Sequence, residues 1–317
     1  MNKIATTNID GNVKVWDADS GILLATMRKH TNHANGVAFS PDNSLIVSID
    51  HNDNGCINFW NASTYQLEKS IKSEYAMNSI AFSSDGTMIC VTNDKGQVLI
   101  YRISTGALIR TLIAHELPVL SAVFTLDNSK IISGGQDKVL IIWNIFTGEI
   151  IGKVFGFTDW ITCIVISPDN SKIAISLTDG KICLLDYITK KLLDLMQYHK
   201  KCVNSIALSP GFFSQLIVSG DINGNIHIKD LKNDYRMLII NENTKPIVTV
   251  VFSPDGMKIV SASIDGRVNI WMIYGKLSLS FQDTCEITAL AYINQPIKPI
   301  CINQPKLSLS NIFSEFY

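Results

Sequence analysis

Short apolar runs alternate with polar turns along most of the chain, and residues 114–144 show this pattern most completely. Pro118 to Phe124 is an apolar run, a polar turn follows at residues 125–128, and Lys130 to Ser133 begins a second run. After another turn, Val139-Leu140-Ile141-Ile142-Trp143 places five large apolar residues in succession. A strand with one solvent-exposed face would alternate apolar and polar residues, so this run predicts a strand covered on both faces.

The same pattern recurs along the chain with a period of 41 to 44 residues. The positions equivalent to Trp143 are Trp16, Trp60, Tyr101, Leu185, Lys229 and Trp271. Six residues before each of these seven positions stands a turn residue, mostly followed by glycine as expected for a tight hairpin: Asp10, Asn54, Lys95, Asp137, Asp179, Asn223 and Asp265. An upstream turn of the type Ser40-Pro41-Asp42 recurs as well, for example at Ser253-Pro254-Asp255. Seven copies in register predict one repeat architecture.

Together these features resemble the WD40-repeat family, and the resemblance extends from Lys3 to about Ile293. The period, the Ser-Pro-Asp-Gly turn, the strand that ends in Trp, and the trailing Thr-Gly at 105–106 and 147–148 carry it. The resemblance implies an all-β fold, a seven-bladed WD40 β-propeller with four-stranded antiparallel blades around a central channel.

The chain begins within a repeat, because residues 3–8 align with a second blade strand and no innermost strand precedes them. The missing strand reappears at Cys285 to Tyr292, so we expect the two ends to share one blade and close the ring. The predicted domain, residues 1–293, then contains a closing blade at 3–28 plus 285–293 and complete blades at 33–72, 77–113, 117–155, 160–196, 202–240 and 245–282. We expect the tail, residues 294–317, to dock on the ring, with capture by a partner as the alternative.

Composition narrows the functional classes. The formal charge of −1 and the lack of long like-charged blocks favour neither nucleic acid nor a membrane surface as a direct partner. The seven cysteines include no Cys-x-x-Cys pair, which favours buried free thiols in a reducing compartment. Without a signal-peptide pattern or a long apolar span, we expect a cytoplasmic or nuclear protein that is neither secreted nor transmembrane. No glycine-rich phosphate loop or metal-ligand spacing is present, so we expect no cofactor and no metal.

Three of the six histidines share one position of the repeat, at His30, His115 and His199. In the WD40 family, this histidine forms a buried hydrogen-bonded set with a hairpin Asp, a strand Ser or Thr, and the strand Trp. Carried over, the set is His115, Ser133, Asp137 and Trp143, with repeat equivalents at His30, His199, Asp10, Asp179, Asp265, Trp16, Trp60 and Trp271. A His, Asp and Ser also suggest a hydrolase triad, but each belongs to a periodic framework, so we expect no enzyme. Lys229, at a Trp position, is expected to reach the rim, to pair with a carboxylate, or to mark a site.

The repeat register also predicts which residues lie on one face of the ring, where WD40 partners commonly dock. The candidate partner-binding face consists of Ile9, Trp160, Ile222, Pro246 and Ile264, large residues that could form an apolar patch. In the alternative interpretation, neighbouring loops half-bury the isoleucines.

The resulting expectation is a non-catalytic protein–protein interaction scaffold, a monomeric ring that joins larger assemblies by binding other proteins or peptides. The alternative is a specificity or substrate-receptor subunit of a larger complex, of the ubiquitin-ligase, RNA-processing or ribosome-assembly type. A propeller hydrolase or lectin would require a pocket of convergent polar groups away from the repeat framework.

Overall fold

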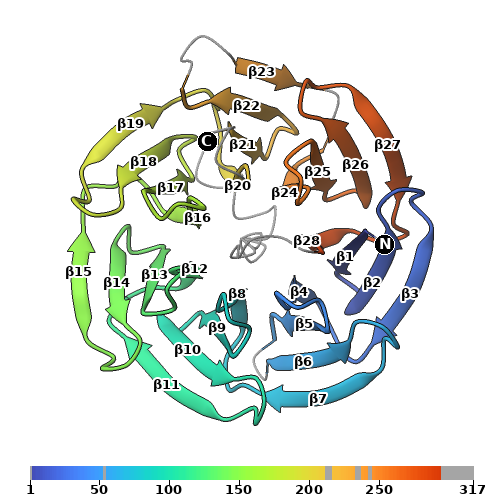
Figure 1. Cartoon of the computed structure of the whole chain (residues 1–317), viewed down its shortest axis with the longest axis horizontal. Helices are drawn as coiled ribbons and strands as arrows, with labels where there is room; N and C mark the ends of the chain where they lie inside the picture. The colour runs from blue at the N-terminus through green and yellow to red at the C-terminus, as the bar shows by residue number, and fades with distance from the viewer. Residues whose placement is uncertain (1, 53–54, 211–215, 233–236, 242–244, 294–317) are drawn as a thin grey trace, which may run out of the picture.

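The protein is a ring of β-sheets around a central axis, as the computed structural model in Figure 1 shows. The structure describes residues 2–52, 55–210, 216–232, 237–241 and 245–293. These residues form seven antiparallel sheets of four strands each, with the first strand of each sheet nearest the axis. The predicted seven-bladed propeller is therefore confirmed. The predicted position of the tail, residues 294–317, lies outside the described residues.

Six blades are continuous in sequence, and we number them in chain order. Blade 1 comprises β4 (Ala34–Phe39), β5 (Leu45–Asp50), β6 (Cys56–Asn61) and β7 (Leu67–Lys72). Blade 2 comprises β8 (Met77–Phe82), β9 (Met88–Asn93), β10 (Gln97–Arg102) and β11 (Leu108–Ile113). Blade 3 comprises β12 (Val119–Phe124), β13 (Lys130–Gly135), β14 (Leu140–Asn144) and β15 (Ile150–Val154). Blade 4 comprises β16 (Ile161–Ile166), β17 (Lys172–Leu177), β18 (Ile182–Asp186) and β19 (Leu192–Met196). Blade 5 comprises β20 (Val203–Leu208), β21 (Leu216–Asp221), β22 (Ile226–Asp230) and β23 (Met237–Ile240). Blade 6 comprises β24 (Ile247–Phe252), β25 (Lys258–Ser263), β26 (Arg267–Met272) and β27 (Leu277–Gln282).

Blade 7 joins the two ends of the described chain. It combines β28 (Ile287–Tyr292) with β1 (Lys3–Asn8), β2 (Asn12–Asp17) and β3 (Leu23–Arg28) in the order β28-β1-β2-β3. The antiparallel register pairs Ile4 with Tyr292 and Thr7 with Ala289. The predicted closure of the ring by a C-terminal inner strand is therefore confirmed, and β1 and β28 each complete the other's sheet.

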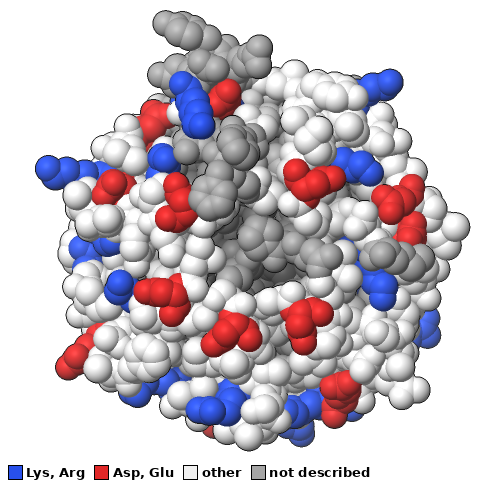
Figure 2. Space-filling view, viewed as in Figure 1, with Lys and Arg blue, Asp and Glu red and all other residues white. Residues whose placement is uncertain are grey.

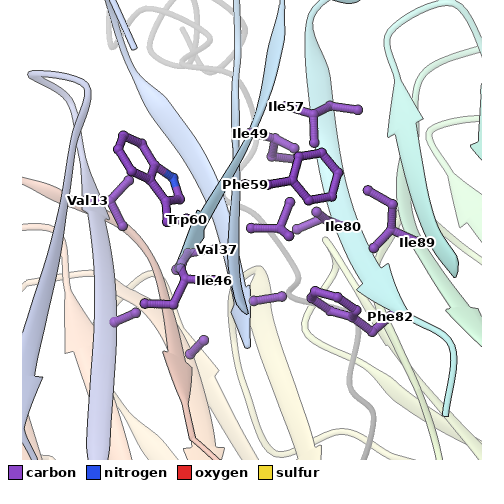
Figure 3. Close-up of a cluster of buried hydrophobic side chains, with 14 of the residues drawn as sticks. Val13, Val37, Ile46, Ile49, Ile57, Phe59, Trp60, Ile80, Phe82 and Ile89 are labelled. Carbon is purple, nitrogen blue, oxygen red and sulfur yellow. The ribbon is translucent and has the colours of Figure 1, made fainter. Parts of the chain in front are cut away.

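The apolar core lies between neighbouring blades. In β12 every residue is buried, whereas the outermost strand of the same blade, β15, is exposed or half-buried at every position. This gradient explains why inner strands read as continuous apolar runs and outer strands as mixed sequences. Figure 3 shows one such core, in which Trp60 packs toward Val13 of blade 7 and Phe59 packs toward Ile80 of blade 2.

Side chains on the innermost strands link the blades around the channel. The second residue of an inner strand donates a hydrogen bond to the carbonyl of the first residue of the next inner strand. Five of the seven junctions have this bond: Asn35 to Met77 (3.2 Å), Asn78 to Val119 (3.2 Å), Thr162 to Val203 (2.6 Å), Asn204 to Ile247 (2.7 Å), and Thr288 to Ala34. At the other two junctions the position is apolar, Leu120 and Val248, so this particular bond is absent there. Ser121 Oγ instead accepts a 3.0 Å hydrogen bond from the N–H of Ile164 between blades 3 and 4.

Candidate interaction face

The most complete polar set of the repeat lies inside blade 3. His115 Nδ1 is 2.7 Å from Asp137 Oδ2, and His115 Nε2 is 2.8 Å from Ser133 Oγ. Trp143 Nε1 donates a 2.8 Å hydrogen bond to the same Ser133 Oγ. Because the indole can only donate, the serine hydrogen is free to bond His115 Nε2, which assigns the remaining imidazole proton to Nδ1, facing Asp137. The four predicted side chains therefore lie in one hydrogen-bonded chain.

His30 and His199 form equivalent sets, but with a different acid from the one that the repeat register predicts. His30 bonds Ser48 at 2.7 Å and Asp50 at 3.0 Å. His199 bonds Ser219 at 2.7 Å and Asp221 at 2.9 Å. Asp50 and Asp221 end their second strands, two positions earlier than Asp137 in the aligned register, where blade 3 has Gly135. A carboxylate at either position reaches the same imidazole nitrogen, so the local sequence decides which residue supplies it.

The predicted acids Asp10, Asp179 and Asp265 contact no histidine, which corrects the sequence-based assignment. Asp10 Oδ2 accepts a 2.6 Å bond from Cys285 Sγ. Asp179 Oδ2 accepts from Thr158 Oγ1 at 2.5 Å and from Lys181 Nζ at 2.6 Å, and Asp265 accepts from Ser263 Oγ at 2.5 Å. The physical reason is that Phe157 and Asp283 replace the histidine in blades 4 and 7; the corresponding residue of blade 6, Asn243, lies outside the described residues.

The tryptophan bond forms in blades with and without the histidine. Trp16 donates to Thr6, Trp60 to Ser48 and Trp271 to Ser261, each at 2.9 Å. In blade 5, Lys229 stands at the tryptophan position, and its Nζ pairs with Asp194 of blade 4 at 2.8 Å. Of the roles considered for Lys229, the structure therefore shows pairing with a carboxylate.

This hydrogen-bonded framework is built to hold the blades. Ser133 is fully buried and already accepts the indole N–H, so its oxygen does not face solvent. Its role is to satisfy polar groups that would otherwise be buried without partners. Across the described residues, no three or more His, Cys, Asp or Glu side chains are grouped so that they could hold a metal ion. The same part of the chain contains no helix long and apolar enough to cross a membrane.

One end of the ring is organised by seven backbone hydrogen bonds that the repeat reproduces. In each blade, the residue after the second strand donates its N–H to the carbonyl of the residue just before the first strand, and the N···O distances are 3.0 to 3.2 Å. The donor–acceptor pairs are Ile9–Glu286, His51–His33, Asp94–Ala76, Gln136–Pro118, Thr178–Trp160, Ile222–Cys202 and Ile264–Pro246. All five predicted face residues belong to these pairs, which places them on the same end of the ring.

The five predicted face residues come from four consecutive blades, 4 to 7. Ile222 is 37% exposed, and Ile9, Trp160, Pro246 and Ile264 are half-buried. The count from the tryptophan position does not find the donor of blade 1, His51, because His51 stands nine residues before Trp60, whereas Gln136 stands seven residues before Trp143. A strand-end count rather than a count from the tryptophan would have found it.

The turns between the two innermost strands, which lie at the opposite end of the ring, are acidic. Asp42, Asp85, Asp127, Asp169 and Asp255 occupy these turns and accept hydrogen bonds from neighbouring Ser or Thr hydroxyls. Burial opposes ionisation of Asp169, but bonds from Ser167 and Ser171 outweigh it and lower the pKa of Asp169 to about 2. Figure 2 shows one end of the ring, with acidic side chains at intervals around the central opening. Five of the seven blades therefore place an aspartate at this end of the ring.

Comparison with known proteins gives matches to repeats of one kind. The family model described as "WD domain, G-beta repeat" matches residues 21–61, 106–144, 148–186 and 236–272. The WD repeat-containing protein SL1-17 of Schistosoma mansoni is 31% identical over 118 residues, 37% of this chain and 38% of that protein. Transcription initiation factor TFIID subunit 5 of Caenorhabditis elegans is 33% identical over 115 residues, 36% of this chain and 17% of that protein. The Target of rapamycin complex subunit wat1 of Schizosaccharomyces pombe is 29% identical over 103 residues, 31% of each chain. The matched segments thus span between 17% and 38% of these relatives.

Proposed function

The chain belongs to the WD40-repeat family, and from that premise we propose that it is a non-catalytic scaffold that binds other proteins through the end of the ring that carries Ile9, Trp160, Ile222, Pro246 and Ile264. We refer to these five residues as the candidate face. One observation carries the proposal: the seven repeated backbone bonds fix these residues at one end, in four consecutive blades. Large apolar and aromatic residues on a rigid support favour protein binding.

The assembly role rests on the family and on its relatives. WD40 propellers generally bind other proteins, and two relatives are named as subunits of larger complexes. We propose that this chain likewise works within a multi-subunit assembly and that partner contacts, rather than chemistry, are its contribution. Of the six described cysteines, Cys56, Cys90, Cys183, Cys202 and Cys285 are free thiols, which supports the proposed placement in the cytoplasm or nucleus, whereas Cys163 is disulfide-bonded, contrary to the expectation from the sequence.

The test is affinity purification from the native cell with a variant that charges the face. Ile222→Glu combined with Ile264→Glu places two carboxylates among apolar residues, and we expect the set of captured proteins to be lost. Both side chains are at least partly solvent-accessible, so the fold should survive, which a thermal melt checks.

The matched control is Met257→Glu. Met257 is 52% exposed and lies in the turn between β24 and β25, in the same blade as Ile264 but at the opposite end of the ring. We expect this control to capture the same proteins as the wild type. If the double variant retains those proteins, the face is elsewhere; if the control loses them too, the acidic end takes part.

A further inference from the structure

Neighbouring blades also meet at the rim, where an outermost strand sends a side chain to the next blade. Lys69 of β7 donates to the carbonyls of Ile103 (2.9 Å) and Ser104 (3.2 Å) in blade 2. Arg110 of β11 does the same in blade 3, to Phe146 at 2.7 Å and Thr147 at 3.1 Å. Lys69 pairs with Phe59 and Arg110 pairs with Ile100, and each partner is the residue just before the tryptophan-equivalent position of its blade.

At four further junctions a side chain of the outermost strand, at the same strand position, also reaches the next blade. Asp194 of β19 pairs with Lys229 of blade 5. Leu238 of β23 lies against Gly275 of blade 6, where an added Cβ would stand 2.6 Å from its Cδ2. Leu279 of β27 and Ala25 of β3 pack against the core clusters that their blades share with the next.

At the junction between blades 3 and 4, this register is occupied by Gly152. Gly152 pairs with Ile142, the residue before Trp143, as Arg110 pairs with Ile100. A Cβ built on Gly152 would meet no atom within 4 Å, so the space beside this backbone is open. Its φ is outside the left-handed region, so an ordinary side chain fits the backbone conformation.

The opposite side of this junction is apolar and exposed. On β19, Leu195 pairs with Cys183 and Leu192 pairs with Leu185. Cys183 and Leu185 belong to the same core cluster as Ile142, which places the two leucines on the side that faces blade 3. Leu192 is 55% exposed and Leu195 is 48% exposed. The junction therefore lacks a filling side chain on one wall and presents leucines on the other.

One end of the junction is positively charged. In four other blades, a glycine ends the turn between the third and fourth strands and receives the side chain from the preceding blade: Gly21, Gly106, Gly148 and Gly275. Blade 4 has Lys190 at this place, with a φ of 60° that side chains rarely adopt. Its ammonium lies 4.0 Å from the centre of the Tyr187 ring, and Lys130 Nζ lies 3.3 Å from Tyr187 Oη. Among the described residues, neither ammonium is paired with a carboxylate.

We propose that this open junction, formed by Gly152, Leu192, Leu195 and Lys190, binds an extended apolar segment of a partner protein that carries a carboxylate at one end. The apolar side chains occupy the space beside Gly152 and bury the two leucines. The carboxylate pairs with the Lys190 ammonium, which complements the unpaired positive charge. Burial and the charge of Lys130 lower the pKa of Lys190, while Asp186 raises it, and an incoming carboxylate would further favour the charged ammonium. This site is separate from the candidate face.

The test uses the full chain and a fluorescein-labelled synthetic decapeptide, with leucine at alternate positions and two glutamates at one end. Fluorescence anisotropy measures its dissociation constant. Gly152→Arg copies the arginine of the preceding junction into open space, so it should fold while blocking the site, and we expect roughly tenfold weaker binding or more. The matched control, Thr111→Arg, adds the same charge to an exposed position of β11, and we expect no change in the dissociation constant.

The role of the Lys190 charge is tested separately. We expect Lys190→Gln to weaken binding of the acidic peptide by roughly tenfold, while Lys191→Gln, at the exposed neighbouring position, leaves it unchanged. A decapeptide with lysines in place of the glutamates should bind roughly tenfold more weakly or not at all. Equal binding of the two peptides would overturn the assignment of a carboxylate.

Other outcomes overturn the proposal as a whole. These are a wild-type chain that binds neither peptide, or a folded Gly152→Arg chain that binds the acidic peptide as tightly as the wild type. Sedimentation velocity adds a third: if the wild type forms a dimer that Gly152→Arg abolishes, a second copy of this chain occupies the junction instead of a partner segment.

Discussion

At the scale of single residues, His115 shows what the repeat histidine does. Both its ring nitrogens are bonded inside the blade, to Asp137 and Ser133. We predict that His115→Ala lowers the free energy of unfolding by about 1–3 kcal/mol, because it leaves buried polar partners without a bond. Urea denaturation measures the loss. The control is His33→Ala, since His33 is exposed and its backbone carbonyl, which bonds His51, is kept. A variant of unchanged stability would reopen a functional role for His115.

His227 makes blade 5 sensitive to acid. Its ring stacks on His199 with centroids 4.0 Å apart, and burial, together with the His199 charge, lowers the pKa of His227 from 6.5 to about 4. Asp221 opposes this shift, and the centroid of the Tyr198 ring lies 6.4 Å from that of His227. In the unfolded protein the His227 imidazole takes up a proton below pH 6.5, whereas in the folded protein it does so only near pH 4. The contribution of the neutral imidazole to the free energy of unfolding is therefore complete above pH 6.5 and is lost as the pH falls toward 4.

We therefore predict that the wild type loses up to about 2 kcal/mol between pH 7 and about pH 5 from this group alone. His227→Asn removes the titration, and Asn58 and Asn269 occupy the same strand position in blades 1 and 6, so the substitution suits the fold. The measurement is the difference between the two urea-unfolding free energies at each pH. Parallel curves for the two proteins would contradict a neutral buried His227.

Residue identity is also where sequence reasoning reached its limit. The histidine register, Ser133 and Trp143 follow from the period because they stand at fixed places on strands. The acids that bond His30 and His199 do not follow from the period, because Asp50 and Asp221 reach the imidazole from a backbone position different from that of Asp137. Four residues separate the second and third strands in both blade 3 and blade 5, so the hairpin length does not tell which position supplies the acid. Only the side-chain geometry of each blade does.

At the scale of elements, blade 7 replaces the histidine set with an ion pair. Asp283 stands at the histidine position, and its Oδ1 lies 2.5 Å from Lys14 Nζ of β2; both side chains are buried. Lys14 pairs with Thr6 as Ile141 pairs with Ser133, so the two blades are equivalent strand by strand. This bond ties the N-terminal strands to the segment that leads into β28.

We predict that Lys14→Ile or Asp283→His alone destabilises the ring by about 3–5 kcal/mol, because each leaves one buried charge uncompensated or misplaced. The double substitution recreates the arrangement of blade 3, with Thr6, Trp16 and Asp10 available as partners, and should recover most of the loss. A double-mutant cycle of unfolding free energies measures the coupling. Additive losses would show that the two side chains do not act as a unit.

The elements themselves were predictable in outline. Apolar runs marked the inner three strands of each blade, and turn residues marked their ends. The rim was less predictable, because outer strands are half-exposed and their pairing across blades, such as Asp194 with Lys229, joins residues with no shared register. The missing side chain at Gly152 is recognised only by comparison with Lys69 and Arg110, which occupy the same strand position in other blades. That comparison needs the strand pairing.

At the scale of the whole molecule, the ring is held by repeated links between neighbours, and each blade depends on both of its neighbours. Hydrogen bonds from the second residue of the inner strand join five pairs of consecutive blades, while at the junction of blades 6 and 7 that position is the apolar Val248. An ion pair between Lys258 and Asp19, at 3.6 Å, also crosses that junction. On the other side, Thr288 of β28 bonds the carbonyl of Ala34 in blade 1. β28 therefore supplies both the inner strand of blade 7 and one of its hydrogen bonds to blade 1, beside the bond from Lys3 to the carbonyl of Ala62.

A chain that ends at Asp283 tests this dependence, because it lacks β28 and leaves β1 with an unpaired edge and the cores on both sides exposed. We predict aggregation or a broad, non-cooperative melt, measured by calorimetry and sedimentation velocity. The matched control ends at Ile293, keeps every described strand and should melt cooperatively as a monomer. If the chain ending at Asp283 also melts cooperatively as a monomer, the other six blades form a stable unit without closure, and β28 is not what holds the ring together.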